Sequence, residues 1–163
     1  MPSISRQKRA SVLLILFMTL FFPTVSYARD IKGITSTQLK EIIKSKSDKV
    51  VAVIFWETQC KVCQEHLSVL NDIYKEHRKE NLEILGVVLD EAGKETKDLV
   101  ETKGVAFPIF KAGDREEMSY IYKISKVPTI YYYKNGELEY HKEEGYAEPD
   151  HIDKDIHKLL GKS

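Results

Sequence analysis

Cys60 and Cys63 are the residues whose type and spacing are best suited to chemistry. They are the only cysteines of the chain, and they stand two residues apart in the segment FWETQCKVC. An apolar run from Val50 to Trp56 precedes them, and apolar residues at helical spacing follow. A strand that leads into C-x-x-C at the start of a helix is typical of a thiol–disulfide redox site. The pattern therefore predicts a redox-active Cys60–Cys63 disulfide.

The roles of the two sulfurs follow from the predicted helix. Cys60 would lie at its N-terminus, where free N–H groups and the helix macrodipole favour an anion. Lys61 adds a positive charge, and both effects lower the pKa of Cys60 below the ordinary thiol value of ~8.5. Cys60 is therefore the expected exposed nucleophile. Cys63, one turn further on and facing the core, is expected to resolve the mixed disulfide.

Resolution requires an acceptor for the proton of Cys63. His66 lies three residues on, on the same face of the predicted helix, and is the best-placed candidate. Glu65 would project roughly 200° away from Cys63 at about 100° per residue. Glu57, in the turn before the helix, is a third candidate. The alternative for His66 is a half-buried packing role with a satisfied hydrogen bond.

Hydrophobic periodicity and turn residues predict the remaining elements. The run from Lys49 to Trp56 is too continuously apolar for a half-exposed strand and suits a central parallel strand covered on both faces. The other expected elements are a short surface helix within 31–47 capped by Ser36 or Thr37, a helix after Cys60 that frays over 77–80, a strand at 82–89, a helix at 94–103, an edge or starting strand at 107–110, a helix at 114–124, a strand at 130–133, a return strand at 137–141 after Asn135-Gly136, and a last helix from Pro149. Alternation followed by a terminal hairpin indicates a mixed sheet with helices on both faces.

The first 28 residues have the pattern of a secretory signal peptide. Three basic residues precede an uncharged, largely apolar run over 10–22, and a small-x-small site follows at Ser26-Tyr27-Ala28. The run is shorter than the ~20 residues that span a bilayer. We therefore expect cleavage after Ala28, with residues 29–163 forming one exported domain. An uncleaved N-terminal membrane anchor is the alternative.

Charge and compartment narrow the class of protein. Without the first 28 residues the chain has 22 basic and 25 acidic residues, a net charge of −3. No basic stripe remains for a phosphate backbone, so we expect no nucleic-acid partner. Outside the cytoplasm a disulfide can persist. A bridge between Cys60 and Cys63 closes so small a loop that it adds little stability, and it is better suited to being broken and re-formed.

Nearly all of the sequence after residue 28 resembles the thioredoxin-like family. The resemblance rests on the strand-Trp-x-x-x-Cys-x-x-Cys-helix segment, on Val127-Pro128-Thr129, and on the hairpin YYYKNGELEY behind it. It implies an α/β thioredoxin fold, a central mixed β-sheet flanked by helices, with Pro128 in the cis form packed against the cysteines. It also implies that the backbone of Val127 pairs with a bound peptide like an added strand. Trp56 is expected either to shield the site and offer a contact surface or to belong to the core.

The 37 residues between Asp90 and Pro128 exceed the minimal thioredoxin pattern. This central insertion, with the signal peptide, makes the chain similar to exported TlpA/ResA-type oxidoreductases and to cytochrome c maturation reductases. The likeness implies a periplasmic or otherwise extracytoplasmic reductant of protein disulfides that is re-reduced by a membrane thiol–disulfide electron donor. We expect it to be monomeric and to have no cofactor or metal. Three positions depart from relatives: Gln59 replaces a second tryptophan, Ile54 a buried acid, and His66 a glutamate.

Other functions stay open at this point. A disulfide oxidase or isomerase of the same fold would use the same atoms and differ in redox poise. Cys60, Cys63 and His66 could instead bind copper or zinc in a chaperone, although no fourth protein ligand is evident. A noncatalytic adaptor is disfavoured because both cysteines are present.

Overall fold

The computed structural model describes residues 30–139 and 143–162, so the expected signal peptide lies outside the described residues. These residues form a seven-stranded sheet in the order β1-β4-β3-β2-β5-β6, with β7 paired to β5. The strands are β1 (Lys32–Ile34), β2 (Val50–Trp56), β3 (Leu82–Val88), β4 (Ile109–Ala112), β5 (Thr129–Lys134), β6 (Glu137–Leu138) and β7 (Glu143–Glu144). Strands β1 to β4 pair in parallel, whereas β5 pairs antiparallel with β2, β6 and β7. The sheet is therefore mixed, as expected.

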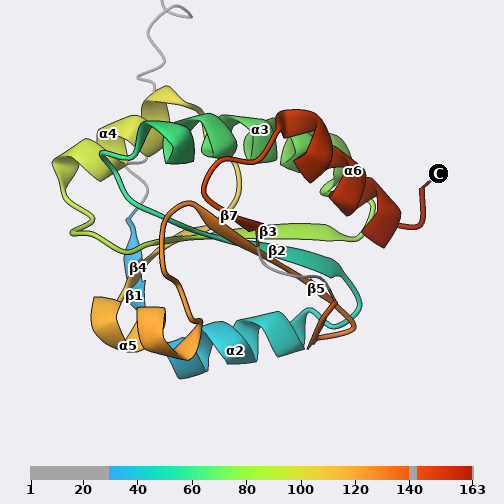
Figure 1. Cartoon of the computed structure of the whole chain (residues 1–163), viewed down its shortest axis with the longest axis horizontal. Helices are drawn as coiled ribbons and strands as arrows, with labels where there is room; N and C mark the ends of the chain where they lie inside the picture. The colour runs from blue at the N-terminus through green and yellow to red at the C-terminus, as the bar shows by residue number, and fades with distance from the viewer. Residues whose placement is uncertain (1–29, 140–142, 163) are drawn as a thin grey trace, which may run out of the picture.

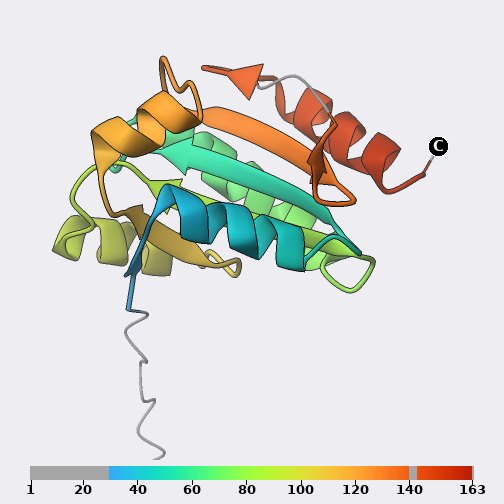
Figure 2. The same cartoon turned by 90° about the horizontal axis from the view of Figure 1, so that it is seen from below.

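Helices cover both faces of the sheet. Figure 1 shows α3, α4 and α6 on one face and α2 and α5 on the other, and Figure 2 shows the second pair from below. The helices are α2 (Ser36–Ser45), α3 (Lys61–His77), α4 (Lys94–Thr102), α5 (Arg115–Ile121) and α6 (Pro149–Leu159). This three-layer arrangement confirms the predicted α/β thioredoxin fold.

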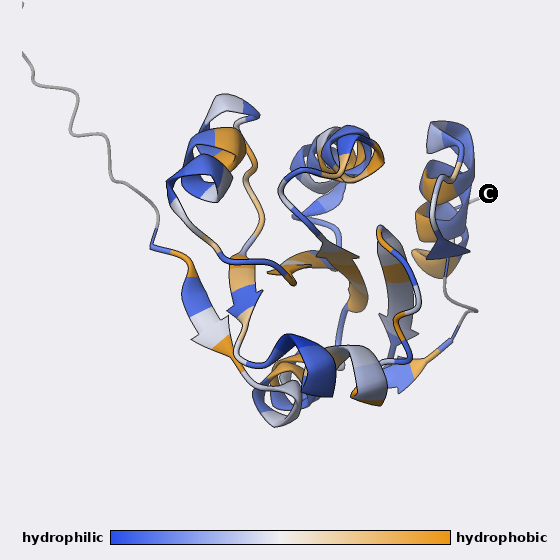
Figure 3. Cartoon of the chain, turned by 60° about the vertical axis from the view of Figure 1, so that its left-hand side comes forward, coloured by the Kyte–Doolittle hydropathy of each residue, from blue (hydrophilic) through white to orange (hydrophobic). Residues whose placement is uncertain are grey.

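The continuous apolar sequence of β2 is explained by its position at the centre of the sheet. Every residue of β2 is buried. Ile54 and its alternate neighbours pack with Leu67 and Leu70 of α3, while Phe55 and its alternates pack with Leu39 of α2. Because successive strand residues point to opposite faces, each face must be apolar when both are covered. Figure 3 shows the same arrangement, with the apolar parts of α3 and α6 turned toward the interior.

The N-terminal part of the domain differs from the prediction. The expected short helix within 31–47 is α2, and its N-cap is Thr35, one or two residues before the expected cap at Ser36 or Thr37. Thr35 Oγ1 accepts the backbone N–H of Gln38 at 3.1 Å, and Gln38 Oε1 accepts the N–H of Thr35 at 2.9 Å. This capping box stops the helix from extending backward. The three residues before Thr35 form β1. Its pairing with β4 stabilises this strand, and no local sequence pattern indicates it.

The segment between β3 and β5, which we expected to be an insertion, contains α4, the internal strand β4 and α5. The expected strand at 107–110 is shifted, since β4 covers Ile109–Ala112 and begins directly after Pro108. Pro108 therefore stands just before the start of a strand, which confirms one of the two predictions for this segment. The edge interpretation is wrong, because β4 lies between β1 and β3. Proline cannot donate to the ladder, but its carbonyl still accepts the N–H of Gly86 at 2.9 Å.

The hairpin after β5 forms at the predicted residues. Asn135 and Gly136 both adopt positive φ, 56° and 76°, which is the geometry of a two-residue hairpin turn. The returning strand β6 ends at Leu138, so it is shorter than the expected 137–141, of which 140 and 141 lie outside the described residues. A further short strand, β7, pairs with the beginning of β5 and was not predicted.

Candidate redox site

The two cysteines form a disulfide at the point where β2 leads into α3. Cys60 is the N-cap of α3 and Cys63 lies in its first turn, with their Cα atoms 5.1 Å apart. Cys60 Sγ also accepts the backbone N–H of Cys63 at 3.1 Å. Cys60 is half-buried, whereas Cys63 is completely buried in the core. The sulfur of Cys60 is therefore the one that a partner molecule can approach.

Asp90, at the end of β3, fixes the turn that carries Cys60. Its Oδ2 accepts the backbone N–H of Thr58 at 2.8 Å, and its Oδ1 accepts the Thr58 hydroxyl at 3.0 Å. The carbonyl of Thr58 accepts the side-chain amide of Gln64 at 2.8 Å, which ties the turn to α3. Because Thr58 is buried, these bonds satisfy polar groups that water cannot reach. The turn is thereby held on both sides of Cys60.

Helix α4 also supports the segment that contains the two cysteines. Thr96 Oγ1 lies 2.8 Å from the hydroxyl oxygen of Thr58, and both residues are buried. Glu95 accepts the side-chain amide of Gln59 at 2.7 Å. Helix α4 is therefore part of the framework around the disulfide. Sequence reasoning missed Asp90 and Thr96; the position of an acid directly after a buried strand was the one feature that could have indicated Asp90.

Pro128 follows a cis peptide bond and lies at the same end of the sheet as the disulfide. The Val127–Pro128 bond is cis. Phe55 pairs with Thr129, so the C-terminal end of β2 and the N-terminal end of β5 lie at the same end of the sheet. Pro128 is buried, and its carbonyl accepts the N–H of Gly145 at 2.7 Å. Val127 is half-buried, and its backbone N–H and C=O make no hydrogen bond to any residue in the described part of the chain.

Trp56 is a core residue and not a contact surface. It is completely buried at the end of β2, so the expectation that it could offer a surface to partners is wrong. Its indole Nε1 has no hydrogen-bond partner among the described residues. Lys61, by contrast, is exposed in the first turn of α3, one residue after Cys60. Its charge is therefore available beside the more accessible sulfur.

His66 is buried beneath the site and is held by the backbone of Ala147. The Nε2 atom of His66 lies 3.0 Å from the Ala147 carbonyl oxygen and 3.2 Å from its amide nitrogen. Its Nδ1 atom is buried without a hydrogen-bond partner among the described residues. Tyr146 lies beside the ring, with centroids 5.8 Å apart. Burial lowers the pKa of His66 below its ordinary 6.5, so the ring is neutral near pH 7.

The other proton-acceptor candidates are placed less well. Glu57 is half-buried, and its carboxylate accepts a hydrogen bond from Arg115 at 2.6 Å. Glu65 is exposed on α3. Ile54, at the position where relatives were expected to carry a buried acid, is completely buried in the core. His66 is therefore the one buried titratable side chain among these candidates.

The alternative metal-binding set of Cys60, Cys63 and His66 is not formed in this disulfide form of the chain. Cys60 and Cys63 are bonded to each other, and the one engaged nitrogen of His66 contacts Ala147. Within residues 30–139 and 143–162, the two groups of three potential metal ligands lie elsewhere, and neither contains a cysteine. The site has the arrangement of a redox pair instead.

The disulfide lies at the N-terminus of a helix, the more accessible sulfur is the N-cap, and a cis proline lies at the same end of the sheet. These features define a thiol–disulfide exchange site on a thioredoxin fold. The sequence profile described as "Thioredoxin-like" matches residues 48–136. The chain is also 30% identical over 149 residues to the thiol-disulfide oxidoreductase ResA of Oceanobacillus iheyensis, covering 80% of this chain and 77% of that one. This chain belongs to the thioredoxin-like family and is a thiol-disulfide oxidoreductase.

Solved structures support the same fold. A thiol:disulfide interchange protein of Chlorobium tepidum aligns with a TM-score of 0.64 at 19% identity, covering 72% of this chain and 83% of that one. A secreted disulfide oxidoreductase of Mycobacterium tuberculosis, homologous to DsbE of E. coli, aligns with a TM-score of 0.61 at 12% identity, covering 70% and 84%. Further relatives named ResA match over about half of their own length.

Proposed function

We propose that this protein is an extracytoplasmic reductant of protein disulfides, with Cys60 as the nucleophile and Cys63 as the resolving thiol. The observation that carries the proposal is the asymmetry of the pair, because Cys60 is half-buried at the helix N-terminus while Cys63 is enclosed in the core. An accessible thiolate at a helix N-terminus is suited to attack. An enclosed thiol is suited to react only with its neighbour.

The reaction begins from the dithiol. The Cys60 thiolate attacks one sulfur of the substrate disulfide, which forms a mixed disulfide and releases the other substrate sulfur as a thiolate that takes up a proton. The Cys63 thiolate then attacks Cys60 Sγ and releases the second substrate sulfur. Two electrons pass to the substrate, and Cys60 and Cys63 are left as the disulfide seen in the structure.

His66 is the proposed acceptor of the Cys63 proton. It lies one turn after Cys63 on α3 and is neutral near pH 7. In the tautomer whose Nε2–H donates to the Ala147 carbonyl, its buried Nδ1 atom is free to take a proton. Ala147 holds the opposite nitrogen of the ring, which fixes its orientation. In His66→Gln we expect a mixed disulfide that forms at the normal rate and resolves more slowly. Equal resolution rates in the variant and the parent would remove His66 from the mechanism.

Val127 is proposed to align the substrate. Its backbone groups make no hydrogen bond within the described residues. They lie just before β5, at the end of the sheet where β2 leads to Cys60. An extended substrate peptide can pair with them like an added strand, which brings its disulfide to Cys60. This mode recognises backbone rather than particular side chains, so it fits protein substrates as a class.

The resemblance to exported reductases supports the compartment and the recycling step. We propose that residues 1–28 direct export as a cleaved signal peptide or a membrane anchor, that the domain acts as a monomer at the outer side of the membrane or in the periplasm, and that a membrane thiol–disulfide donor re-reduces it. Among the described residues, the structure has no helix with the length and apolar character needed to cross a membrane. Reduction of apocytochrome c before haem attachment is the proposed setting.

Trapping experiments test the proposed roles. Cys63→Ala should accumulate a covalent adduct with a disulfide-containing apocytochrome peptide, whereas Cys60→Ala should form none. An adduct through Cys63 in the Cys60→Ala variant would reverse the assignment. The direction is tested by the reduction potential of the pair, which we expect near the thioredoxin value of about −270 mV. A value near the strongly oxidising end, about −120 mV, would indicate an oxidase instead.

A further inference from the structure

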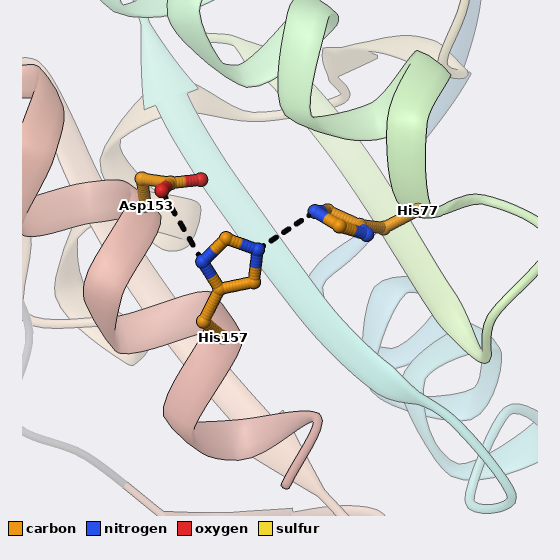
Figure 4. Close-up of side chains that lie close together, drawn as sticks. All are labelled: His77, Asp153 and His157. Atoms are coloured by element: carbon orange, nitrogen blue, oxygen red, sulfur yellow. Dashed lines mark hydrogen bonds and ion pairs between the residues drawn. The ribbon is translucent and has the colours of Figure 1, made fainter. Parts of the chain in front are cut away.

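A pair of histidines joins α3 to α6 at the end of α3 remote from the disulfide. His77 is the last residue of α3, and His157 lies in α6, 80 residues later. Their Nε2 atoms lie 2.9 Å apart, and Figure 4 shows the two nitrogens facing each other. At about 1.5 Å per helical residue, His77 lies roughly 25 Å along the helix from Cys60. The pair is therefore separate from the disulfide-exchange site.

Carboxylates face the outer nitrogen of each ring. His157 Nδ1 lies 3.2 Å from Oδ2 of Asp153, and His77 Nδ1 lies 3.0 Å from Oε2 of Glu80. An ionised carboxylate only accepts hydrogen bonds, so each Nδ1 that bonds to one must carry a proton. In neutral rings both Nε2 atoms are then left with lone pairs, and these point at each other. Two lone pairs at this separation require a positive charge between them.

In the metal-free protein a proton can take that place. The Lys162 ammonium lies 3.2 Å from His77 Nδ1 and also contacts Glu80. When Lys162 donates to Nδ1, His77 carries its proton on Nε2 and donates it to His157. In either arrangement one proton lies between the two Nε2 atoms. A metal ion that binds there releases this proton to solvent.

We propose that His77 and His157 bind a divalent transition-metal ion, of which Zn²⁺ fits best, through their Nε2 atoms. Zn–N distances of about 2.0–2.1 Å in a tetrahedral site place two nitrogens roughly 3.3 Å apart. The two nitrogens therefore need to separate by about 0.4 Å, and both rings need to turn so that their lone pairs converge on an ion beside the line between the nitrogens. A carboxylate on the second nitrogen is the arrangement that fixes the tautomer and orientation of zinc-binding histidines, and here both rings have one.

The surroundings offer further ligands and a route of entry. Glu76 Oε1 lies 3.7 Å from His77 Nε2, and its exposed carboxylate can turn toward the ion. Asp153 and the two histidines offer ligand atoms that all lie within 4.8 Å of one another. His77 is buried, whereas His157 is half-exposed, so the ion can enter from the solvent side of α6. We assign both Nε2 atoms and the Glu76 carboxylate as ligands, with water completing the site and Asp153 and Glu80 as positioning residues.

A zinc ion at this position would cross-link two helices from opposite ends of the sequence. An ion that binds the folded chain and not the unfolded one raises the thermal midpoint as its concentration rises. The link would act on the packing of α6 against α3 without touching either cysteine. We therefore expect disulfide-reductase activity at the level of the parent in variants of His157.

Calorimetric titration of Zn²⁺ into the oxidised full-length protein tests the site, because the disulfide keeps both thiols from binding zinc. We expect one ion per chain and a thermal midpoint that rises with zinc. Asp153→Asn should weaken binding about 10–100-fold, and His157→Gln should abolish it. With Cu²⁺ as a second probe, electron paramagnetic resonance should show two nitrogen ligands in the parent protein.

His151→Gln is the matched control, because His151 belongs to the separate group with Glu143 and Asp155. It should bind zinc like the parent protein. Three results would overturn the proposal: no zinc binding by the folded parent, unchanged binding by folded His157→Gln, or loss of binding in His151→Gln. Circular dichroism of each variant establishes that it is folded.

Discussion

Cys60 is the N-cap of the helix that carries Cys63: its sulfur accepts the backbone N–H of Cys63 at 3.1 Å and is also bonded to the sulfur of Cys63. In the dithiol form that N–H remains in the first turn of α3, where it can stabilise a thiolate on Cys60. The helix macrodipole acts in the same direction. The local geometry thus prepares one particular sulfur of the pair for ionisation.

The first prediction concerns the acidity of this sulfur. In Cys63→Ala, which leaves Cys60 as the only thiol, we expect the pKa of Cys60 to lie below the ordinary value of about 8.5. The pH dependence of its alkylation by iodoacetamide measures this. Lys61→Ala in the same background should raise the pKa by a few tenths of a unit, because an exposed charge is largely screened. A pKa of Cys60 at or above about 8.5 would refute the nucleophile assignment.

The second prediction concerns the turn before the disulfide. Asp90→Ala removes both acceptors of Thr58 and leaves a buried N–H and hydroxyl with fewer partners. We expect a loss of about 1–3 kcal/mol in the free energy of unfolding, together with slower disulfide exchange. Urea unfolding of the oxidised protein measures the first effect. Glu91→Ala is the control, since that exposed side chain should change stability by less than about 0.5 kcal/mol. Equal stabilities of the two variants would contradict the role of Asp90.

The third prediction concerns packing beneath Trp56. A Cβ at Gly86 would clash with Ile109 Cδ1 and would lie 3.3 Å from Phe107 and 3.4 Å from the Trp56 indole nitrogen. Gly86→Ala should therefore cost about 1–3 kcal/mol of unfolding free energy through overpacking. Gly33→Ala in β1 is the matched control, because nothing lies within 4 Å of its added Cβ. If the denaturant midpoints of the two variants coincide, the close packing around Gly86 does not limit the size of the side chain at that position.

The fourth prediction concerns the pH dependence contributed by His66. Burial lowers the pKa of His66 below 6.5 in the folded protein, so between that lowered pKa and 6.5 the unfolded chain binds more protons. Stability is therefore lost as the pH falls from about 6.5 through the folded pKa, by at most about 1.4 kcal/mol per pH unit. The unfolding free energy of His66→Gln, measured over the same range, should fall less steeply. Parallel curves for the parent protein and the variant would refute the lowered pKa.

Much of the redox site could be predicted because its parts are adjacent in sequence. The apolar run of β2, the C-x-x-C spacing and the helical stripe from Cys63 to His77 lie within one segment. Local periodicity and the chemistry of the residue types are enough to order a strand, a turn and a helix. The hairpin at Asn135-Gly136 was predictable for the same reason, since its turn geometry depends on those two residues.

The tertiary structure decided what depends on residues far apart in the chain. Asp90 reaches Thr58 across 32 positions, and His66 meets Ala147 across 81. Strands β1 and β7 are too short to have a pattern of their own and exist through their partners. No local spacing could show that Trp56 is fully enclosed or that His77 faces His157, because these follow from how helices pack on the sheet. The sequence by itself determined which sulfurs react, while the packing determined how they are held and what lies around them.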